Sequence, residues 1–365
     1  MAEPDGEPQP VYDPAGVTAD WLTAVLDHAG ISDGARVVGF DHEDIGTGQV
    51  GANVRYRLRY DSPHAAGPAS IVAKFAASDD ASRAAGIATR TYETEVAFYR
   101  DLAATVDISR PVCFYAAIES GTADVVLLLE DMAPAEPGDQ IAGCGVAQAE
   151  LAVDEAARLH GPRWGDPTLL DHRWLAEGVE AGPGIADLYT WAWDQFRPRF
   201  EATLEPGALE VGLELRDRVH HWLQHRPPAL TLVHGDYRLD NMLFGPALVP
   251  ASRPLTVVDW QTVRLGCGTL DVAYFLGAGL DAATRRSAEH ALVARYHRAL
   301  EAYGVGGYPF EACWEDYRRF SYSGYLMAVV ASVLVGRTDR GDAMFMAMAN
   351  RHAAQITDLG ASELL

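Results

Sequence analysis

The spacing of apolar residues changes character about one third of the way along the chain. In the first third, apolar and polar residues alternate over short runs, which is the period of a half-buried β-strand. The clearest run is 54–60, where three arginines separate two tyrosines, a valine and a leucine. The pattern predicts an antiparallel sheet with a helix at 19–30 and another at 89–106. The strands are expected at 37–60 (two strands around a glycine-rich turn), 70–76, 113–119 and 123–132.

After Met132 the apolar residues recur at helical spacing. Pro134, Pro137 and Gly138 interrupt the earlier pattern, so a hinge is placed near Met132. The sequence then predicts three short β-segments, at 230–235, 241–245 and 255–260. Helices are expected at 146–161, 185–200, 211–225, 282–303, 310–335 and 342–359. The expected organisation is a disordered tail at 1–16, a first lobe at 17–132 and a helical lobe at 133–365. The tail is acidic and rich in proline, and it lacks the basic and apolar regions of a signal peptide.

Composition and charge narrow the function. The 365 residues exceed what one hydrophobic core usually serves, which agrees with two lobes. The net charge of −22 disfavours binding to nucleic acid or to an anionic membrane. The longest apolar stretch, 325–336, is too short to cross a bilayer and predicts a buried helix. The four cysteines form no CxxC pair, so we expect neither a metal cluster nor disulfides, and a cytoplasmic protein. We expect the protein to be a monomer or a homodimer.

The stretch LVHGDYRLDNMLFG places four polar side chains between apolar segments. Asp236 and Asn241 have the spacing D-x-x-x-x-N, and Asp259 follows at the end of the apolar stretch LTVVDW. Phosphoryl transfer needs one carboxylate to orient the attacking hydroxyl, and amide and carboxylate oxygens to hold magnesium. The plain alternative is a Gly-Asp turn whose aspartate caps its own backbone. The presence of Asp259 downstream favours the catalytic interpretation.

The first third of the chain supplies further candidates. The run GTGQVG fits G-x-G-x-x-G through Gly46, Gly48 and Gly51, but it precedes a strand and not a helix, which argues against a dinucleotide fold and an oxidoreductase. Lys74 lies inside the apolar strand IVAKFA, where it is either an exposed edge residue or a ligand of nucleotide phosphates. A buried lysine needs a carboxylate partner. We prefer Glu95, and Glu93 remains open because the two project from different faces of their helix.

These motifs together resemble the aminoglycoside phosphotransferase/choline kinase superfamily, and most closely its ecdysteroid-kinase-like bacterial phosphotransferases. The resemblance covers about residues 35–355 and is strongest from 233 to 275. It implies an α+β, bilobal protein-kinase-like fold, with an N-terminal antiparallel sheet lobe and a larger helical C-terminal lobe. By the resemblance, the lobe at 17–132 would bind the nucleotide, and the lobe at 133–365 would carry the catalytic loop and the acceptor site. It also implies roles for single residues. Asp236 would be the catalytic base, Asn241 and Asp259 would bind magnesium, and His234 would brace the loop. The implied nucleotide-binding residues are Gly46, Gly48, Gly51, Lys74, Glu95, Glu130 and Met132.

Two neighbouring residues, Asp271 and Arg238, keep two interpretations each. By the resemblance Asp271 would bond the amides of the catalytic loop, although its position also fits a helix N-cap. Arg238 either steers a substrate or is a solvated surface arginine. His160 is expected to pack near the catalytic loop. His-Gly-Asp replaces the His-Arg-Asp of protein kinases, so no arginine is expected beside the base.

The resemblance implies an ATP-dependent transfer of the γ-phosphoryl group to a hydroxyl of a small molecule, with Mg²⁺. The alternative is an inactive nucleotide- or small-molecule-binding protein on the same scaffold, which usually lacks one of the key residues. ATP, rather than GTP, is the family default. The acceptor is not named by the sequence. The aromatic residues of 174–200 are either core or part of an acceptor pocket.

Overall fold

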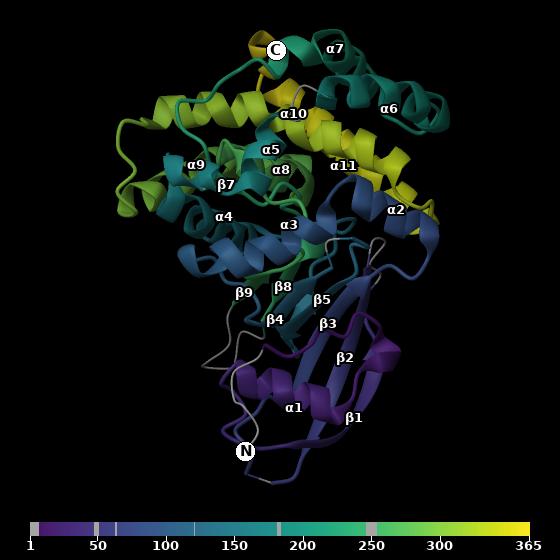
Figure 1. Ribbon diagram of the computed structural model, residues 1–365. Helices are drawn as coiled ribbons and strands as arrows, with labels where there is room; N and C mark the ends of the chain where they lie inside the picture. Colours follow the sequence, from purple (N-terminus) through teal and green to yellow (C-terminus); the bar gives the residue numbers. More distant parts are fainter. Residues whose placement is uncertain (1–6, 47–50, 63, 120, 181–183, 246–253) are drawn as a thin grey trace. The chain divides into compact units, whose positions relative to one another are not determined.

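The computed structural model describes residues 7–46, 51–62, 64–119, 121–180, 184–245 and 254–365 (Figure 1). By its contacts the chain forms two compact units. Unit 1 comprises Met1–Ala103 and Arg110–Ala133. Unit 2 comprises Ala104–Ser109 and Pro134–Leu365. Each unit has its own hydrophobic core and is described separately.

Unit 1 is built on a five-stranded antiparallel sheet with the strand order β1-β2-β3-β5-β4. Alternate residues of the central strands are buried, which confirms the period-two pattern; Val54 and Tyr56 on β2 and Ile71 on β3 join the core with Leu22 of the helix α1. The elements are α1 (Ala19–His28), β1 (Val37–Asp44), β2 (Gly51–Tyr60), β3 (Ser70–Ala76), α2 (Asp80–Ala88), α3 (Thr91–Ala97), β4 (Cys113–Ile118) and β5 (Val125–Glu130).

Two features of unit 1 differ from the sequence-based expectation. The helix α2, which Asp79 caps at its N-terminus, precedes α3 and was not predicted. The segment from residue 7 to 16, expected to be disordered, is held in place: Tyr115 donates a hydrogen bond to the Pro8 carbonyl (2.6 Å), and Trp21 Nε1 donates to the Gln9 carbonyl (2.8 Å). Within this segment Pro14–Gly16 form one 3-10 turn that Asp13 caps, and the carbonyls of Pro8 and Gln9 accept hydrogen bonds from the neighbouring core.

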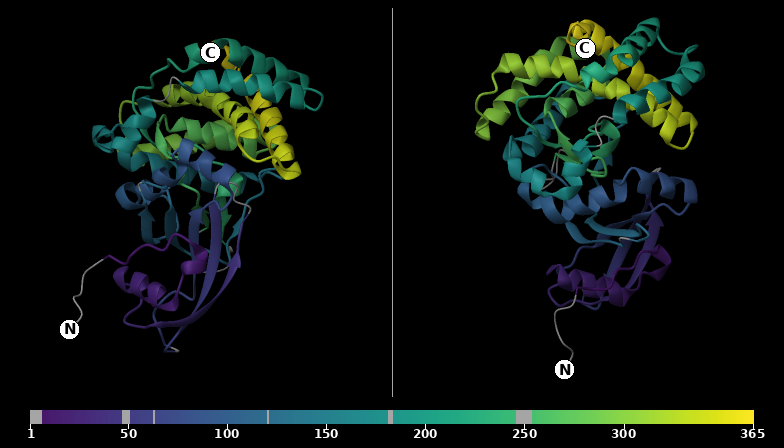
Figure 2. Two further views of the ribbon diagram at one scale, coloured as in Figure 1. Left: turned by 45° about the vertical axis from the view of Figure 1, so that its right-hand side comes forward. Right: turned by 45° about the horizontal axis from the view of Figure 1, so that its top comes forward.

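Unit 2 is helical, with five short strands, and its helices α10 and α11 run side by side (Figure 2). Every residue of α8 is buried, and this helix packs against α4, α10 and α11. The helices are α4 (Val146–His160), α5 (Arg173–Glu180), α6 (Gly184–Phe200), α7 (Pro206–Trp222), α8 (Thr269–Gly279), α9 (Ala282–Ala302), α10 (Phe310–Leu334) and α11 (Asp339–Asp358). The strands are β6 (Glu136–Pro137), β7 (Thr231–Val233), β8 (Met242–Phe244), β9 (Leu255–Val257) and β10 (Arg264–Gly266).

The fold class is confirmed: an antiparallel sheet unit is followed by a larger helical unit. Within unit 2, short strands flank the loop 234–241, which carries Asp236 and Asn241. β7 pairs with β10, and β8 pairs with both β6 and β9, so the segments that enter and leave the loop are each fixed by a ladder. In the described part of the chain, no helix is long and apolar enough to cross a membrane.

Candidate active site

The loop between β7 and β8 turns sharply at Gly235. Its φ of 81° lies in the left-handed region, which side chains with a Cβ rarely adopt. A Cβ at this position would also lie 2.3 Å from Arg264 Nη1 and 2.6 Å from the Thr262 carbonyl oxygen. The glycine of the motif is therefore required both by the backbone and by the space around it.

Asp271 fastens this turn to the buried helix α8. Its carboxylate accepts hydrogen bonds from the amides of His234 (2.6 Å) and Gly235 (3.0 Å), and it lies 3.2 Å from His160 Nε2. Burial alone would raise the pKa of Asp271, but the hydrogen bond and charge of His160, with further help from His234, lower it. Asp271 is the third residue of α8 and Gly268 is its N-cap, so the N-cap interpretation of Asp271 is wrong.

Two buried histidines, His234 and His160, stabilise the loop. His234 is fully buried, its Nε2 lies 3.1 Å from the Val258 carbonyl oxygen, and its ring packs against Trp260. His160, also fully buried, lies between Asp271 and the hydroxyl of Tyr296, which is 2.8 Å from Nδ1. Neither imidazole reaches the surface, which fits positioning of the loop and not chemistry on a substrate.

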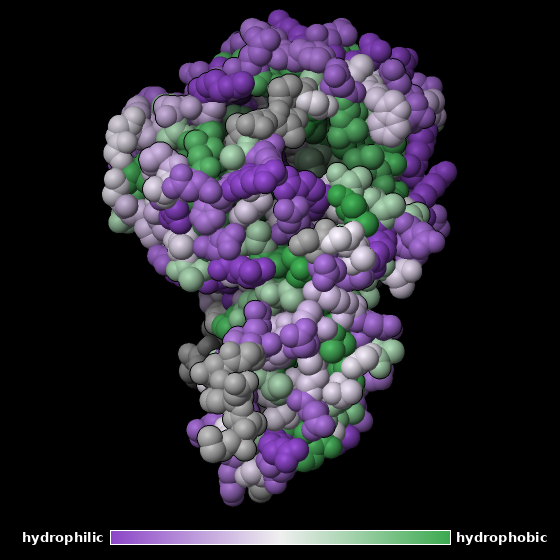
Figure 3. All heavy atoms as spheres, in the orientation of Figure 1, coloured by the Kyte–Doolittle hydropathy of each residue, from purple (hydrophilic) through white to green (hydrophobic). Residues whose placement is uncertain are grey.

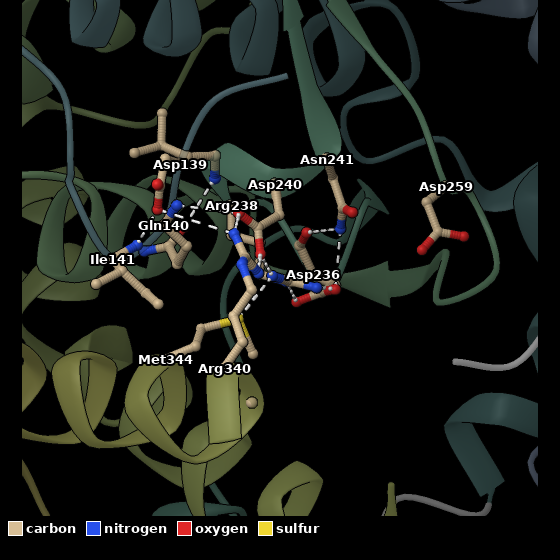
Figure 4. Close-up of polar contacts among 12 residues, drawn as sticks. Asp139, Gln140, Ile141, Asp236, Arg238, Asp240, Asn241, Asp259, Arg340 and Met344 are labelled. Carbon is tan, nitrogen blue, oxygen red and sulfur yellow. Dashed lines mark hydrogen bonds and ion pairs between the residues drawn. The ribbon is translucent and has the colours of Figure 1, made fainter. Parts of the chain in front are cut away.

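Asp236 is the carboxylate at the centre of the site (Figure 4). Its side chain is 17% exposed. Tyr274 donates to Oδ1 (2.8 Å), Asn241 Nδ2 donates to Oδ2 (2.9 Å), and Arg238 Nε lies 3.1 and 3.0 Å from the two oxygens. Burial opposes the charge of Asp236, but Arg238 and the Tyr274 hydroxyl outweigh it and lower the pKa. Asp236 is therefore ionised at neutral pH and held in one orientation.

The second carboxylate of the loop, Asp240, has a different set of partners. Its Oδ1 accepts from the Gln140 amide (3.0 Å), and its Oδ2 accepts from Arg238 Nη1 (2.7 Å). Arg340 of α11 approaches both oxygens at 3.4 Å. Figure 4 shows Asp240 turned towards Asp139–Ile141 and away from Asp259. Asp240 thus ties the loop to the chain that follows β5, and Arg238 bridges the two carboxylates.

Asn241 and Asp259 supply the donor atoms that magnesium prefers. Asn241 Nδ2 donates to the Asp236 carbonyl and carboxylate, both at 2.9 Å, which leaves its amide oxygen for a ligand. That oxygen points to the side on which Asp259 lies (Figure 4). Asp259 has a φ of 67°, a strained conformation that is concentrated at functional sites, and Gln261 donates to its Oδ2 (3.1 Å). Two hard oxygen donors fit magnesium, which takes its other ligands from phosphates and water. Among the described residues there is no group of three or more His, Cys, Asp and Glu side chains that could hold a metal.

In unit 1, Lys74 contacts one of its two candidate partners. Lys74 Nζ lies 2.5 Å from Glu95 Oε2, and the two side chains are 14% and 4% exposed. Glu93 instead pairs with Arg90 one turn earlier on the same helix, on the exposed side. The partner of Lys74 is therefore Glu95 and not Glu93. Lys74 is a largely buried, paired cation and not a solvated edge residue.

The structure gives less information on the other residues that were predicted to bind the nucleotide. Gly46 has a φ of 76°, and a Cβ on Gly51 would lie 2.9 Å from the Phe75 carbonyl, so both positions favour glycine. Gly48 lies outside the described residues. Glu130 ends β5, where its backbone and its side chain both bond to Val112, and Met132 is half-buried just after it.

The aromatic residues of α6 divide between the core and the surface. Tyr189, Trp193 and Phe196 are fully buried and stack on one another in the core of unit 2. Trp191 is 49% exposed, and Trp174 on α5 is half-buried. Of the two interpretations of these aromatic residues, the core interpretation therefore holds for Tyr189, Trp193 and Phe196. Figure 3 shows a hollow in the surface of unit 2 with apolar residues along one rim.

Sequence reasoning missed four residues of the site, namely Tyr274, Gln140, Arg264 and Arg340. Tyr274 follows Asp271 by three positions, so helical spacing could have placed both on one face of α8. Gln140 is fully buried, and its Oε1 accepts from the Leu239 amide (2.8 Å). No local pattern marks Gln140 or Arg340, because each lies about a hundred residues from the loop in sequence.

The model of the ecdysteroid kinase-like family matches residues 198–304, which contain the loop 234–241 and α8. The acyl-CoA dehydrogenase family member 11 of Gallus gallus is 28% identical over 129 residues, which is 34% of this chain and 14% of that protein. The match therefore spans only a small part of that relative.

Two solved structures resemble the chain over most of its length. The ethanolamine kinase of Plasmodium vivax is 10% identical, with a TM-score of 0.52, over 93% of this chain and 86% of that one. The GDP complex of a variant aminoglycoside 2'-phosphotransferase of type IIIa is 14% identical, with a TM-score of 0.50, over 89% and 95%. The chain shares its fold with these two structures, which confirms the kinase-like fold that the resemblance in the sequence implied.

Proposed function

We propose that this protein is a small-molecule kinase, which transfers the γ-phosphoryl group of ATP to a hydroxyl of its acceptor. One observation carries the proposal. Asn241 donates two hydrogen bonds to Asp236, and its amide oxygen is turned to the side of Asp259. A carboxylate for the hydroxyl is thereby coupled, within one loop, to Asn241, one of the two proposed oxygen ligands for magnesium; the other, Asp259, follows β9, which pairs with the strand that leaves the loop.

Asp236 would orient the acceptor hydroxyl and receive its proton. Its lowered pKa makes it a weak base. That suits phosphoryl transfer, in which the transition state is loose and catalysis comes mainly from positioning and electrostatics. Tyr274, Arg238 and Asn241 fix both carboxylate oxygens, so little reorientation is needed when the hydroxyl arrives.

The remaining charged residues would hold the nucleotide. Magnesium held by Asn241 and Asp259 would neutralise charge on the phosphates. Lys74, oriented by Glu95, would contact the α- and β-phosphates. The GDP complex of one structural relative supports a nucleotide as the ligand.

The alternative function is a binding protein without turnover. The engagement of Asp236 by Arg238 favours it, because a paired carboxylate is a poorer proton acceptor. The presence of Lys74, Asp236, Asn241 and Asp259 together argues for catalysis.

The test is a panel of hydroxyl-bearing metabolites and drugs, scored by release of ADP or GDP from the corresponding triphosphate with magnesium present. We expect at least one compound to raise release above the rate without acceptor, and the Asp236→Asn variant to lose that increment. Tight magnesium-nucleotide binding with no acceptor-dependent release would support the binding protein instead. Absence of both would contradict the two proposals together.

A further inference from the structure

Because His-Gly-Asp replaces His-Arg-Asp, no arginine was expected beside the base, and this expectation is wrong: Arg238 of the same loop contacts Asp236. The fold brings a second arginine close to the base from another strand. Arg264 begins β10 and pairs with Val233, the residue before the catalytic loop. Its Nη1 fills the space in which a Cβ of residue 235 would lie. A guanidinium is therefore packed against the backbone of Gly235, next to Asp236.

In the part of the chain that the structure describes, no residue accepts a hydrogen bond from this guanidinium or forms an ion pair with it. The two nearest carboxylates are engaged elsewhere: Asp271 by His160 and two amides, and Asp236 by Arg238, Tyr274 and Asn241. Burial lowers the pKa of Arg264, and the charges of Asp271 and Asp236 offset this only in part.

Two other arginines with little exposure are paired with carboxylates. Arg285 is fully buried and forms ion pairs with Glu289 and Asp358. Arg55, in unit 1, is half-buried like Arg264 and pairs with Asp131. A guanidinium carries five N–H donors, and removing it from water without acceptors is costly. The N–H donors of the half-buried Arg264 have no acceptor among the described residues and are therefore available to a ligand.

We propose that Arg264 binds an oxyanion of a substrate in the active site. The planar fork of a guanidinium matches the paired oxygens of a phosphate or carboxylate. Two sources share this chemistry: the terminal phosphate of the nucleotide and an acidic group on the acceptor. The inference rests on the proposed function in one respect: it takes the nucleotide as one of the two sources of the oxyanion. Gly235 contributes by leaving the space that the guanidinium occupies.

The first experiment is calorimetric titration of inorganic phosphate, without magnesium and at constant ionic strength, into the wild type, Arg264→Gln and Arg264→Lys. We expect Arg264→Gln to raise the Kd for phosphate about tenfold or more, the effect of losing one charge-assisted pair. Arg264→Lys should retain part of the affinity, because it keeps the charge but not the fork. The matched control is Arg286→Gln, which removes the same charge from an exposed arginine on α9 that pairs with Asp358.

Titrations with Mg·ATP and Mg·ADP separate the two sources. If Arg264→Gln weakens ATP binding but not ADP binding, the oxyanion is the terminal phosphate. If it weakens only phosphate, and phosphate still binds to the nucleotide complex, the oxyanion belongs to the acceptor. The proposal is overturned if phosphate binds the wild type and Arg264→Gln equally, or if Arg286→Gln weakens phosphate binding as much. Failure of the wild type to bind Mg·ADP would refute the proposed function, and would leave a loss of phosphate binding in Arg264→Gln standing.

Discussion

Lys74 in unit 1 and Asp236 in unit 2 are both buried charges, but they are held in different ways. Lys74 lies on a regular strand and has Glu95 of the following helix as its ion-pair partner. Asp236 lies on an irregular loop with three donors, and the loop is fixed by residues of α4, α8 and the segment after β6. The first arrangement uses one ion pair on a rigid sheet. The second uses a network to make an irregular backbone rigid.

The difference predicts how substitutions will act. A change at Lys74 should remain local, because the sheet holds its shape without the ion pair. A change in the loop network should affect stability as well as chemistry, because polar groups there leave partners unsatisfied when one is removed. The following predictions test that contrast.

The largest effect is expected for Asp236→Asn. Loss of a positioned base should lower acceptor-dependent turnover roughly 10²–10⁴-fold. The Kd for Mg·ATP should stay within about twofold, since Asp236 is not one of the proposed metal ligands. Steady-state turnover at saturating nucleotide and calorimetric titration check the two parts. An Asp236→Asn enzyme with wild-type turnover would remove Asp236 from the chemistry.

Lys74→Ala is expected to be next. Losing one charge-assisted contact to phosphate should raise the Kd for Mg·ATP on the order of 10- to 100-fold, with little change in thermal stability. Glu95→Gln should weaken binding in the same direction, and Glu93→Gln is the matched control because Glu93 pairs with Arg90 at the surface. Equal losses from the two glutamate variants would show that the Lys74–Glu95 pair does not orient the lysine.

Asp271→Asn should act through stability. An asparagine cannot accept all the bonds of the buried carboxylate, so the free energy of unfolding should fall by about 1–3 kcal/mol at neutral pH. Because the folded-state pKa of Asp271 is lowered, its contribution is present above the unfolded value of about 4 and is lost as the pH falls below it. Denaturant unfolding at several pH values should therefore show the wild type and the variant converging at acid pH. A difference that grows on acidification would contradict this sign.

Arg340→Gln should have the smallest effect. The Arg340 side chain is 52% exposed, and exposed ion pairs contribute about 0–1 kcal/mol. Asp240→Asn should cost more stability than Arg340→Gln, because it also disturbs the bonds from Arg238 and the Gln140 amide. Thermal melting of both variants provides the comparison, and the reverse order would mean that Asp240 does not hold the loop.

The spacing of residues along the sequence predicted those features of the fold that depend on local patterns. Alternation predicted the strands of unit 1, and helical spacing predicted six helices of unit 2. The motif spacing placed Asp236 and Asn241 in one loop. The choice between Glu93 and Glu95 needed the phase of α3, which the pattern left open.

The long-range contacts were beyond local patterns. Tyr274 reaches Asp236 only because α8 is buried beneath the loop, and Arg264 reaches Gly235 only because β10 pairs with β7. The expected disorder of 7–16 failed for a related reason. Composition describes a segment alone, and the bonds to Trp21 and Tyr115 come from elsewhere in the fold.

The most direct test of the central claim follows the phosphoryl group itself. The wild type and Asp236→Asn are each incubated with magnesium, a metabolite mixture and ATP whose γ-phosphate carries heavy oxygen, and the products are analysed by mass spectrometry. The account predicts at least one small molecule that gains the labelled phosphoryl group with the wild type and not with Asp236→Asn. Labelled inorganic phosphate as the sole labelled product, or the same labelled molecule from both proteins, would contradict it.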